Sequence, residues 1–322
     1  MINLKKFKKK ITDLILYFLL IPSCFAFLVY KKRGPKNAPI VTALLRKIGV
    51  FPILNHYYDP QFKFTSEEIK SLNIRKLFGI NLNIEFQLNF LSRLKYNDEL
   101  IALNFQKNKH NKTNKIDFNI DNGSFEAGDA DFYYQIIRYF KPKKIIEVGS
   151  GHSTKLAQIA IYKNFEETKI KTKIICIEPY ENKWLEKLDV EVLREKIENI
   201  DLDWHNELLE NDILFIDSSH VIRPNGDILK IYLEIIPQLR SGVIIQIHDI
   251  FTPNNYLKSW LIEDVRLWNE QYILEALLTN NHKIEIISSL NFLKNNHFNK
   301  LKECCPYLTN DKEPGSIYLK II

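Results

Sequence analysis

Four side chains in the second half of the chain are of the types that transfer protons or bind metal ions: Asp217, His220, His248 and Asp249. Asp217 ends one short apolar run, and His220 follows it by three residues. His248 and Asp249 end the next apolar run. Imidazole titrates near physiological pH, so His220 and His248 are candidate general bases, with Asp217 as a catalytic partner. Asp217, His248 and Asp249 are also candidate ligands for a divalent metal ion.

Each of these residues also has a purely structural interpretation. Asp217 could cap a helix or accept backbone amides at the end of a strand, and a single loop histidine is usually just hydrogen-bonded in place. We favour a functional site because two acids and two histidines fall at the ends of neighbouring predicted strands. The carboxyl ends of parallel strands meet at one edge of a sheet, where ligands bind.

A glycine turn, E-V-G-S-G over residues 147–151, follows the first predicted strand. Such a turn lets a nucleotide-like ligand approach the backbone, but the NAD fingerprint needs a small residue where Thr154 stands. Glu147 ends a buried strand, so its carboxylate needs a partner, either a ligand ammonium, water or the amides of the turn. Glu178 ends the second predicted strand and is placed to accept both hydroxyls of a ribose.

Short apolar runs alternate with segments of helical length after about residue 126. This pattern is typical of a parallel sheet covered on both faces, because its strands are buried on both sides. The predicted strands are Lys144–Val148, Ile174–Glu178, Val190–Leu193, Ile213–Asp217, Val243–His248, Ile284–Ile287 and Ile317–Ile321. The predicted helices are Ser153–Lys163, Glu181–Leu188, Gly226–Leu239, Glu263–Thr279 and Asn291–Glu303. Residues 37–125 are predicted to be a mostly helical extension, with a solvated loop at 107–115.

Several motifs together resemble the class I S-adenosylmethionine-dependent methyltransferases. They are E-V-G-S-G-H-S-T from residue 147, F-I-D-S-S-H at 215–220, G-V-I-I-Q-I-H-D-I-F at 242–251 and W-N-E-Q-Y at 268–272. The resemblance covers about residues 45–322. It implies an α/β fold, a Rossmann-like seven-stranded mostly parallel sheet with helices on both faces over 126–322. It also implies that S-adenosylmethionine is the donor and that the acceptor is an oxygen of a sugar, a glycan intermediate or another small molecule.

The resemblance also assigns roles to the cofactor-binding residues. The turn residues that would wrap the methionine part of the cofactor are Gly149, Ser150 and Gly151. Glu147 would orient its ammonium group and Glu178 would hold its ribose. Ser153 stands where the family usually has a third glycine, and its hydroxyl is predicted to cap the following helix.

The metal site departs from the family pattern at one position. In metal-dependent O-methyltransferases similar to this family, one acid follows the fourth strand and two adjacent oxygen ligands follow the fifth. Asp217 and Asp249 match that pattern, whereas His248 offers a nitrogen. A nitrogen donor shifts the preference away from Mg²⁺, toward softer metals or toward no metal.

The net charge of +6 is concentrated in the leader, residues 1–36. The leader has nine basic residues and one acid, a charge of +8, so the remaining chain, with 36 basic and 38 acidic residues, carries −2. A nearly neutral body argues against nucleic-acid binding, which needs a basic face. The four cysteines show no metal-ligand spacing and predict a reducing compartment.

The leader contains 17 uncharged residues from Leu14 to Tyr30, about 26 Å of helix. It predicts a membrane helix over 14–30, with membrane contact through residues 11–33. A helix buried against the protein and bent at Pro22, and a secretory signal, are the alternatives. Because S-adenosylmethionine is cytosolic, the catalytic domain is expected in the cytoplasm, attached to the inner face of the membrane.

Aromatic residues outside the motifs give two further predictions. The predicted acceptor lid, within 37–125, contains Phe51, His56, Tyr57 and Tyr58. The aromatics predicted to pack in the core on one helical face are Trp260, Trp268 and Tyr272. Two other functions stay open at this point: an NAD(P)-dependent oxidoreductase, and a non-catalytic scaffold tethered to the membrane.

Overall fold

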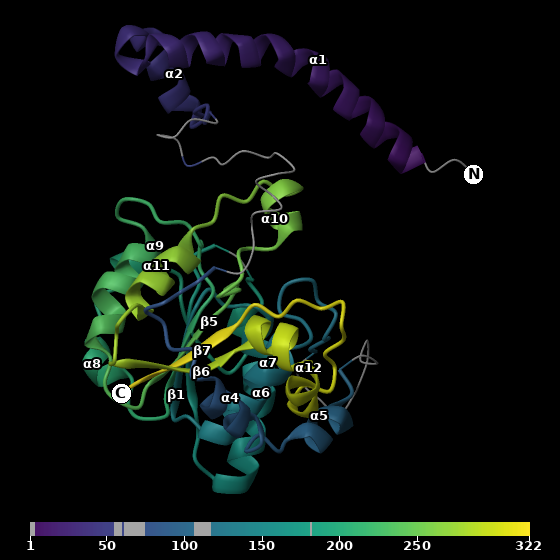
Figure 1. The fold of residues 1–322 in the computed structure, drawn as a ribbon, viewed down its shortest axis with the longest axis vertical. Coiled ribbons are helices and arrows are strands. Elements are labelled where there is room, and N and C mark those ends of the chain that lie inside the picture. The colour runs from purple at the N-terminus through teal and green to yellow at the C-terminus, as the bar shows by residue number, and fades with distance from the viewer. Residues whose placement is uncertain (1–3, 55–59, 61–74, 106–116, 181) are drawn as a thin grey trace. The chain divides into compact units, whose positions relative to one another are not determined.

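The computed structural model describes residues 4–54, 60, 75–105, 117–180 and 182–322. The chain divides into two compact units, Met1–Thr65 and Ser66–Ile322, each of which is described by itself (Figure 1). The boundaries predicted at residues 36 and 125 are not tested by this division and stay predictions. The predicted loop 107–115 and the lid residues His56, Tyr57 and Tyr58 lie outside the described residues.

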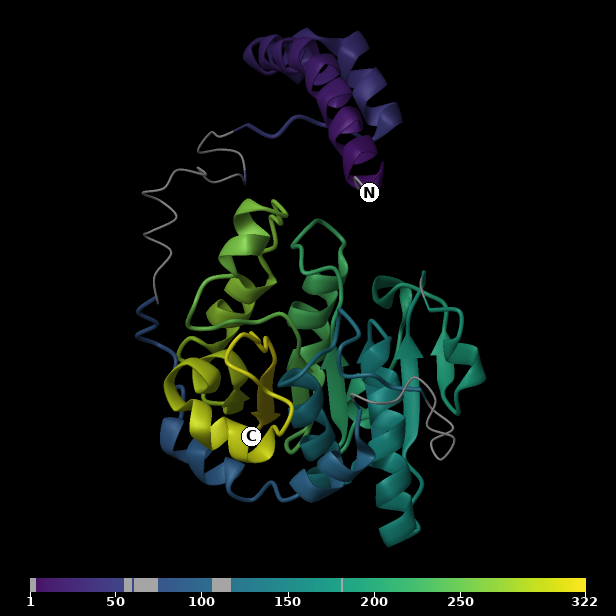
Figure 2. The same ribbon diagram turned by 90° about the vertical axis from the view of Figure 1, so that its right-hand side faces the viewer.

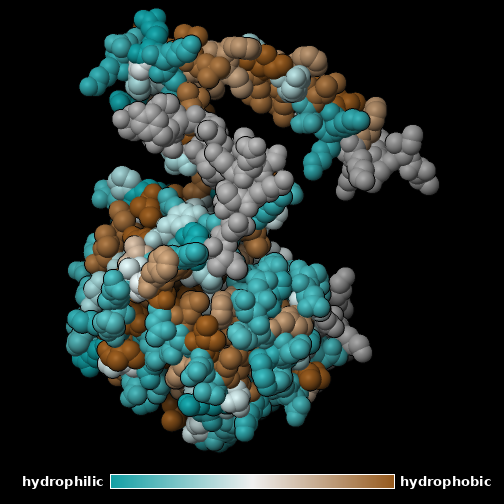
Figure 3. Space-filling view, viewed as in Figure 1, coloured by the Kyte–Doolittle hydropathy of each residue, from teal (hydrophilic) through white to brown (hydrophobic). Residues whose placement is uncertain are grey.

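The first unit consists of helix α1 (Leu4–Arg33), a 3₁₀ turn (Pro35–Asn37) and helix α2 (Pro39–Ile48). Within α1, Phe7–Arg33 is long and apolar enough to cross a membrane, by length and composition alone. Figure 3 shows its apolar surface between hydrophilic ends. Within the first unit its apolar side chains are exposed (Phe18 by 65%). The alternative of a helix buried against the rest of the protein stays a prediction.

The second unit contains a seven-stranded sheet in the order β3-β2-β1-β4-β5-β7-β6 (Figure 2). Its strands are β1 (Lys144–Val148), β2 (Lys173–Ile177), β3 (Glu191–Leu193), β4 (Ile213–Ile216), β5 (Ile244–Ile247), β6 (Ile284–Ser289) and β7 (Ile317–Ile321). Only β7 is antiparallel to its neighbours, β5 and β6. The predicted α/β, Rossmann-like, mostly parallel sheet is confirmed.

Alternate side chains of the strands enter two separate cores. Ile145 and Phe215 face one core, while Ile146 and Leu214 face the other. The helices of the first core are α4 (Ile84–Leu91), α5 (Asn97–Leu103), α6 (Asp129–Phe140), α7 (His152–Thr168) and α12 (Leu290–Cys304). Those of the second core are α8 (Trp204–Glu207), α9 (Asp227–Leu229) with the helical turns that follow it to Gln238, and α11 (Glu270–Leu278). Helices thus cover both faces, as predicted.

Two predicted helices differ from the structure. In the described part of Glu181–Leu188 only a 3₁₀ turn forms, Leu185–Lys187. The single helix predicted over Glu263–Thr279 is also wrong, because a short helix α10 (Lys258–Ile262) ends before that segment and α11 begins only at Glu270. Val265 interrupts the helical spacing with a positive φ of 53°, which a β-branched residue adopts only when the surroundings force it.

Candidate functional site

The glycine turn lies at the carboxyl end of β1, between the ends of β2 and β4. Gly149 has a φ of 80° and its amide donates to the carbonyl of Ile177 (3.0 Å). A Cβ at this position would overlap the carbonyl oxygen of Asp217. Only glycine therefore fits here, and the turn lies in van der Waals contact with the loop that carries the acid of β4.

Glu147 lies beneath this turn, fully buried. Its carboxylate accepts hydrogen bonds from the hydroxyls of Tyr133 (3.3 Å) and Thr154, and Ser153 adds to this bonding. Burial raises the pKa of Glu147 to about 7, although the hydroxyl donors oppose the rise. Glu147 thus holds the first turn of α7, and its predicted bond to a ligand ammonium stays a prediction.

Glu178 follows β2 and reaches back to the turn. Its two carboxylate oxygens accept the amides of Tyr180 (2.9 Å) and Ser150 (3.4 Å). The side-chain amide of Asn182 closes the turn from the same side by donating to the carbonyl of Ser150 (2.9 Å). The structure therefore brings together Glu178 and the turn at 149–151, as the resemblance implied.

The capping role predicted for Ser153 is wrong. Helix α7 begins at His152, which places Ser153 inside its first turn, where a side chain cannot act as the N-cap. The hydroxyl of Thr154 instead accepts the amide of Gly151 (3.2 Å). Ser153 is buried beside Glu147, so its contribution to a cofactor site would be indirect.

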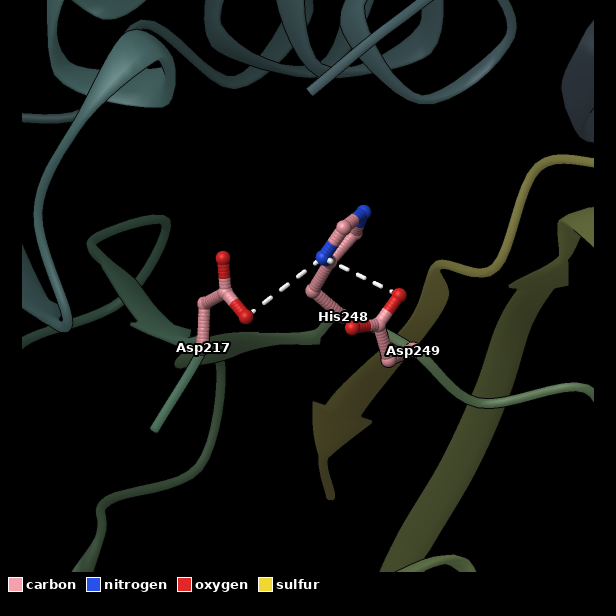
Figure 4. A group of neighbouring side chains, drawn as sticks. All are labelled: Asp217, His248 and Asp249. Carbon is pink, nitrogen blue, oxygen red and sulfur yellow. Dashed lines mark ion pairs between the residues drawn. The ribbon is translucent and has the colours of Figure 1, made fainter. Parts of the chain in front are cut away.

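The acid and histidine cluster lies at the ends of β4 and β5. Figure 4 shows Nδ1 of His248 between the carboxylates of Asp217 and Asp249. It lies 3.5 Å from Oδ1 of Asp217 and 3.4 Å from Oδ1 of Asp249. This Nδ1 atom is buried and has no hydrogen-bond partner among the described residues. The structure therefore brings the three predicted metal ligands together, with Nδ1 of His248 between the two carboxylates.

Asp129 faces the other nitrogen of His248. Its Oδ2 lies 3.6 Å from Nε2, and its carboxylate accepts the amides of Gly315 (3.0 Å) and Ser316 (2.8 Å). A carboxylate on one side of an imidazole favours the tautomer that carries its proton on that side. Nδ1 therefore faces Asp217 and Asp249, toward which it directs a proton in the imidazolium and a lone pair once that proton is lost.

His220 meets the same two aspartates from the loop after β4. Its Nε2 lies 3.3 Å from Oδ1 of Asp217 and 3.5 Å from Oδ2 of Asp249. Its Nδ1 lies 2.8 Å from Oε2 of Glu270, a fully buried carboxylate whose other oxygen accepts the hydroxyl of Tyr232 (3.0 Å). Both histidines thus have one nitrogen bound to a buried acid and the other facing the aspartate pair.

The backbone at this cluster is strained at two positions. His220 has a φ of 59° and Asp249 a φ of 60°, values that few residues other than glycine adopt. The carbonyl of His220 accepts the amides of Asn269 (3.0 Å) and Glu270 (3.1 Å), the first free donors of α11. Residues held in sparsely populated conformations cluster at functional sites, which supports a functional role for this cluster.

The charges of the cluster strongly perturb one another. Burial alone would lower the pKa of His220, but the carboxylates of Asp217 and Glu270 raise it to about 10. For the same reason Asp249 and Asp217 hold the pKa of His248 well above its usual value. Burial opposes the ionisation of Asp217, yet the two imidazoles keep its pKa well below the usual range. Burial and the neighbouring Asp217 raise the pKa of Asp249.

The donor set fits a divalent metal ion. Ligand atoms held tetrahedrally ~2.1 Å from one metal lie ~3.4 Å apart, and the His248 separations of 3.5 and 3.4 Å match this. The two carboxylates that face Nδ1 carry the negative charge that a cation would offset, and a metal bound there would displace the Nδ1 proton of His248. With a nitrogen among the donors, the set favours a transition metal over Mg²⁺.

None of the three aromatic residues predicted to pack in the core lies in either core, and one of them, Trp268, packs beside this cluster. The ring of Trp268 packs on His220, with centroids 4.3 Å apart. The guanidinium of Arg266 lies between the rings of Trp260 (4.3 Å) and Trp268 (4.6 Å). Tyr272 is 41% exposed. The prediction of core packing is therefore wrong for all three residues, and Trp268 supports the site residue His220.

Sequence reasoning missed four residues of this site: Asp129, Asn182, Tyr232 and Glu270. Glu270 was part of the W-N-E-Q-Y motif but received no role. Tyr232 lies in a predicted helix but received no role, and Asp129 begins α6, for which no helix was predicted. One signal was available in the sequence: an acid at the start of an apolar segment is expected to be buried, and a buried acid needs a partner.

No protein-family model matches the chain. The chain is 31% identical over 180 residues to an uncharacterised protein of Archaeoglobus fulgidus, a match that covers 52% of this chain and 78% of the archaeal protein. The chain therefore belongs to the same family as that archaeal protein.

Solved structures similar to this chain are methyltransferases. The mitomycin 7-O-methyltransferase MmcR is 13% identical, with a TM-score of 0.38 over 60% of this chain, and the chain spans 54% of it. The plantazolicin methyltransferase BpumL in complex with SAH is 15% identical, with a TM-score of 0.36 over 79% of this chain and 97% of that one. The fold assignment rests on the strand order of the sheet.

Proposed function

We propose that this protein is an S-adenosylmethionine-dependent methyltransferase that methylates a hydroxyl oxygen of a sugar, a glycan intermediate or a similar small molecule. One observation carries the proposal, namely the contact between the glycine turn at Gly149 and the backbone of Asp217. It places a turn suited to a nucleotide-like cofactor directly beside a cluster of acids and histidines. This contact lies between β1 and β4, where the strand order reverses, which is the ligand-binding position of open α/β sheets.

In this proposal the cofactor occupies the ends of β1 and β2. The backbone of Gly149, Ser150 and Gly151 wraps its methionine part, and Glu178 accepts the ribose hydroxyls. Ligand hydroxyls would replace the long bond that Glu178 now accepts from the Ser150 amide (3.4 Å). Glu147 holds the first turn of α7 through Thr154, and its carboxylate is the predicted partner of the cofactor's ammonium group.

Methyl transfer is an in-line displacement. The acceptor oxygen forms a bond to the methyl carbon while the bond from carbon to sulfur breaks, and its electron pair stays on sulfur. The hydroxyl proton passes to a base, for which Nε2 of His220 is best placed, because Glu270 holds the opposite nitrogen. His220 must be neutral to accept a proton, so the negative charge around it has to be offset by cationic ligands, and a sulfonium donor supplies one positive charge.

Asp217, His248 and Asp249 would hold the divalent metal. Bound there, the metal would lower the pKa of an acceptor hydroxyl and so assist its deprotonation. Asp129 orients His248 for that role. The chain itself would place the acceptor between these three residues and the cofactor turn. Such positioning of the reactants supplies most of the rate enhancement.

An NAD(P)-dependent oxidoreductase is the competing enzyme class. The dinucleotide-binding order 3-2-1-4-5-6 is parallel throughout, whereas this sheet inserts the antiparallel β7 between β5 and β6. The residue three places after the second glycine is Thr154, whose hydroxyl is engaged by Glu147. Both observations favour the methyltransferase.

Calorimetry of the purified chain with S-adenosylhomocysteine and with NAD tests the proposal. Binding of the first alone is expected, and Glu178→Gln is expected to weaken it by about 10-fold to 100-fold, since charged hydrogen bonds contribute ~1.5 to 3 kcal/mol. The exposed Glu191→Gln is the matched control. Binding of NAD but not of S-adenosylhomocysteine would overturn the assignment. Transfer itself is measured as a mass increase of a glycan fraction incubated with labelled donor.

The location follows from the cofactor and the leader. S-adenosylmethionine is cytosolic, so the second unit works in the cytoplasm, and α1 attaches it to the inner face of the membrane. This placement is supported by the one described helix with the length and composition of a span.

A further inference from the structure

The first unit exposes a second apolar element beyond the predicted membrane segment. Helix α2 and the residues after it, 39–53, carry large apolar side chains on the surface, and Ile40 is 85% exposed. The full set is Ile40, Val41, Leu44, Ile48, Val50, Phe51 and Ile53. Contiguous exposed apolar surface of this kind marks an interaction site.

The apolar side chains of α2 share one face. Ile40, Leu44 and Ile48 are four residues apart, so they stack along one side of the helix. Arg46 lies on the opposite side, and Lys47 lies at the edge of the apolar face. A short helix with one apolar face and basic flanks is typical of helices that lie in a membrane interface.

Contacts within the first unit hold α2 against the carboxyl-terminal end of α1. The hydroxyl of Tyr30 lies 3.0 Å from Oγ1 of Thr42, and both residues are buried. Thr42 also donates to the carbonyl of Pro35 (2.9 Å) in the turn between the helices. Tyr30 is the last residue of the apolar run in α1, so α2 packs at the point where a spanning helix would leave the hydrocarbon.

The charge around this point suits an anionic surface. Residues 31–49 contain six basic residues and no acidic one. Clusters of lysine and arginine directly beside a membrane helix attract anionic lipid headgroups. Figure 1 shows that the chain turns after α1, so α2 does not continue its line.

We propose that α2 lies in the cytoplasmic interface of an anionic membrane, with Ile40, Leu44 and Ile48 in the acyl region and Arg46 and Lys47 among the headgroups. The argument is the continuity of this face with the apolar α1 and its charge complementarity to anionic lipid. The cytoplasmic side rests on the proposed use of S-adenosylmethionine, whereas the surface placement of α2 does not depend on methyl transfer. It predicts that the protein has two membrane elements, a span and a surface helix fixed to it by Tyr30 and Thr42.

Site-specific labelling of the full chain in vesicles tests this proposal. A nitrobenzoxadiazole label is attached to Leu44→Cys, or to the control Ala43→Cys, which lies about 100° around the helix. Both carry Cys24→Ser, since the other cysteines are buried and Cys24 is exposed. Vesicles contain phosphatidylcholine with or without 30% phosphatidylglycerol, a composition chosen as about physiological.

In anionic vesicles we expect the label at 44 to be at least three-fold less accessible to an aqueous quencher than the label at 43, and to be quenched by brominated lipid. Arg46→Gln with Lys47→Gln should reduce that protection at least two-fold, whereas Arg46→Lys with Lys47→Arg should retain it. Equal accessibility at 43 and 44 would overturn the proposal. Protection from both quenchers would also overturn it, because the face would then be covered by protein, either this chain or a second copy.

Discussion

Nδ1 of His220 lies 2.8 Å from Oε2 of Glu270, although the two residues are 50 positions apart in the chain. Glu270 is the first residue of α11. The backbone amides of Asn269 and Glu270, at the start of this helix, donate to the carbonyl of His220. Tyr232 donates to the other oxygen of the same carboxylate. The start of α11 thus holds both the ring and the backbone carbonyl of His220. Only Nε2 of the ring is left to face the aspartates.

Replacing Glu270 by glutamine tests whether this arrangement positions a catalytic base. An amide neither fixes the tautomer nor stabilises the imidazolium that forms, so turnover is expected to fall about 10-fold to 100-fold, as for other outer partners of functional histidines. The pH profile of kcat should shift, while the affinity for S-adenosylhomocysteine stays unchanged. Glu263→Gln, an exposed acid before α11, is the control. Unchanged turnover and pH profile in Glu270→Gln would show that the contact is structural only.

The metal preference of the cluster is a second prediction. Because His248 provides a nitrogen, Mn²⁺ or Zn²⁺ should bind at least ten-fold more tightly than Mg²⁺, and His248→Asp should reduce that preference. Asp249→Asn should weaken the binding of every metal. Calorimetry with each metal measures the affinities, and turnover after dialysis against EDTA measures the requirement. Full activity without metal would contradict the metal role and leave His220 as an unaided base.

Most of the sheet could be predicted from the sequence because its strands are continuous apolar runs. The bounds of β1 and β7 were predicted without error, and β2, β4 and β5 were predicted one residue too long at their carboxyl ends. The residues in excess there, Glu178, Asp217 and His248, still donate their amides to carbonyls of the neighbouring strands, and each lies directly after its strand. An apolar run shows where a strand lies, but not where its last side chain turns toward a ligand.

The partners of the histidines could not be predicted from the sequence. Asp129 and His248 are 119 positions apart, and they meet only because α6 and the end of β5 pack at one edge of the sheet. The break before α11 was missed because Leu261, Val265 and Trp268 have helical spacing. Periodicity reports which faces are apolar, and it does not report the positive φ of Val265 that ends the pattern.

Gly149→Ala is a third prediction, on stability. Alanine at a positive φ costs about 1 kcal/mol, and the overlap with the Asp217 carbonyl should add ~1 to 3 kcal/mol. Gly123→Ala is a matched control, since its φ is 84° and its Cβ would meet nothing within 4 Å. Denaturant unfolding in one detergent compares the two. Equal losses of stability would show that the turn does not contact Asp217.

Glu147 gives a prediction on pH. Its pKa is about 7 in the fold against 4.5 in the unfolded chain, so the folded state binds more protons between these values and stability falls as pH rises through that range. From pH 5 to pH 8 this loss amounts to ~2 kcal/mol. Glu147→Gln cannot ionise, so its unfolding free energy should decrease less than that of the wild type between pH 5 and pH 8. Parallel pH dependence of the two proteins would exclude the raised pKa.

The same variant separates the two roles open to Glu147. If its carboxylate binds the ammonium group of the cofactor, S-adenosylhomocysteine should bind more tightly as pH rises through about 7, because only the ionised form attracts a cation. If Glu147 only holds the first turn of α7 through Thr154, the affinity should not follow this titration. The comparison with Glu147→Gln removes the contribution of the histidines, which titrate in both proteins. A pH-dependent difference in affinity between the two proteins therefore assigns Glu147 to the ligand, and a constant difference assigns it to the turn.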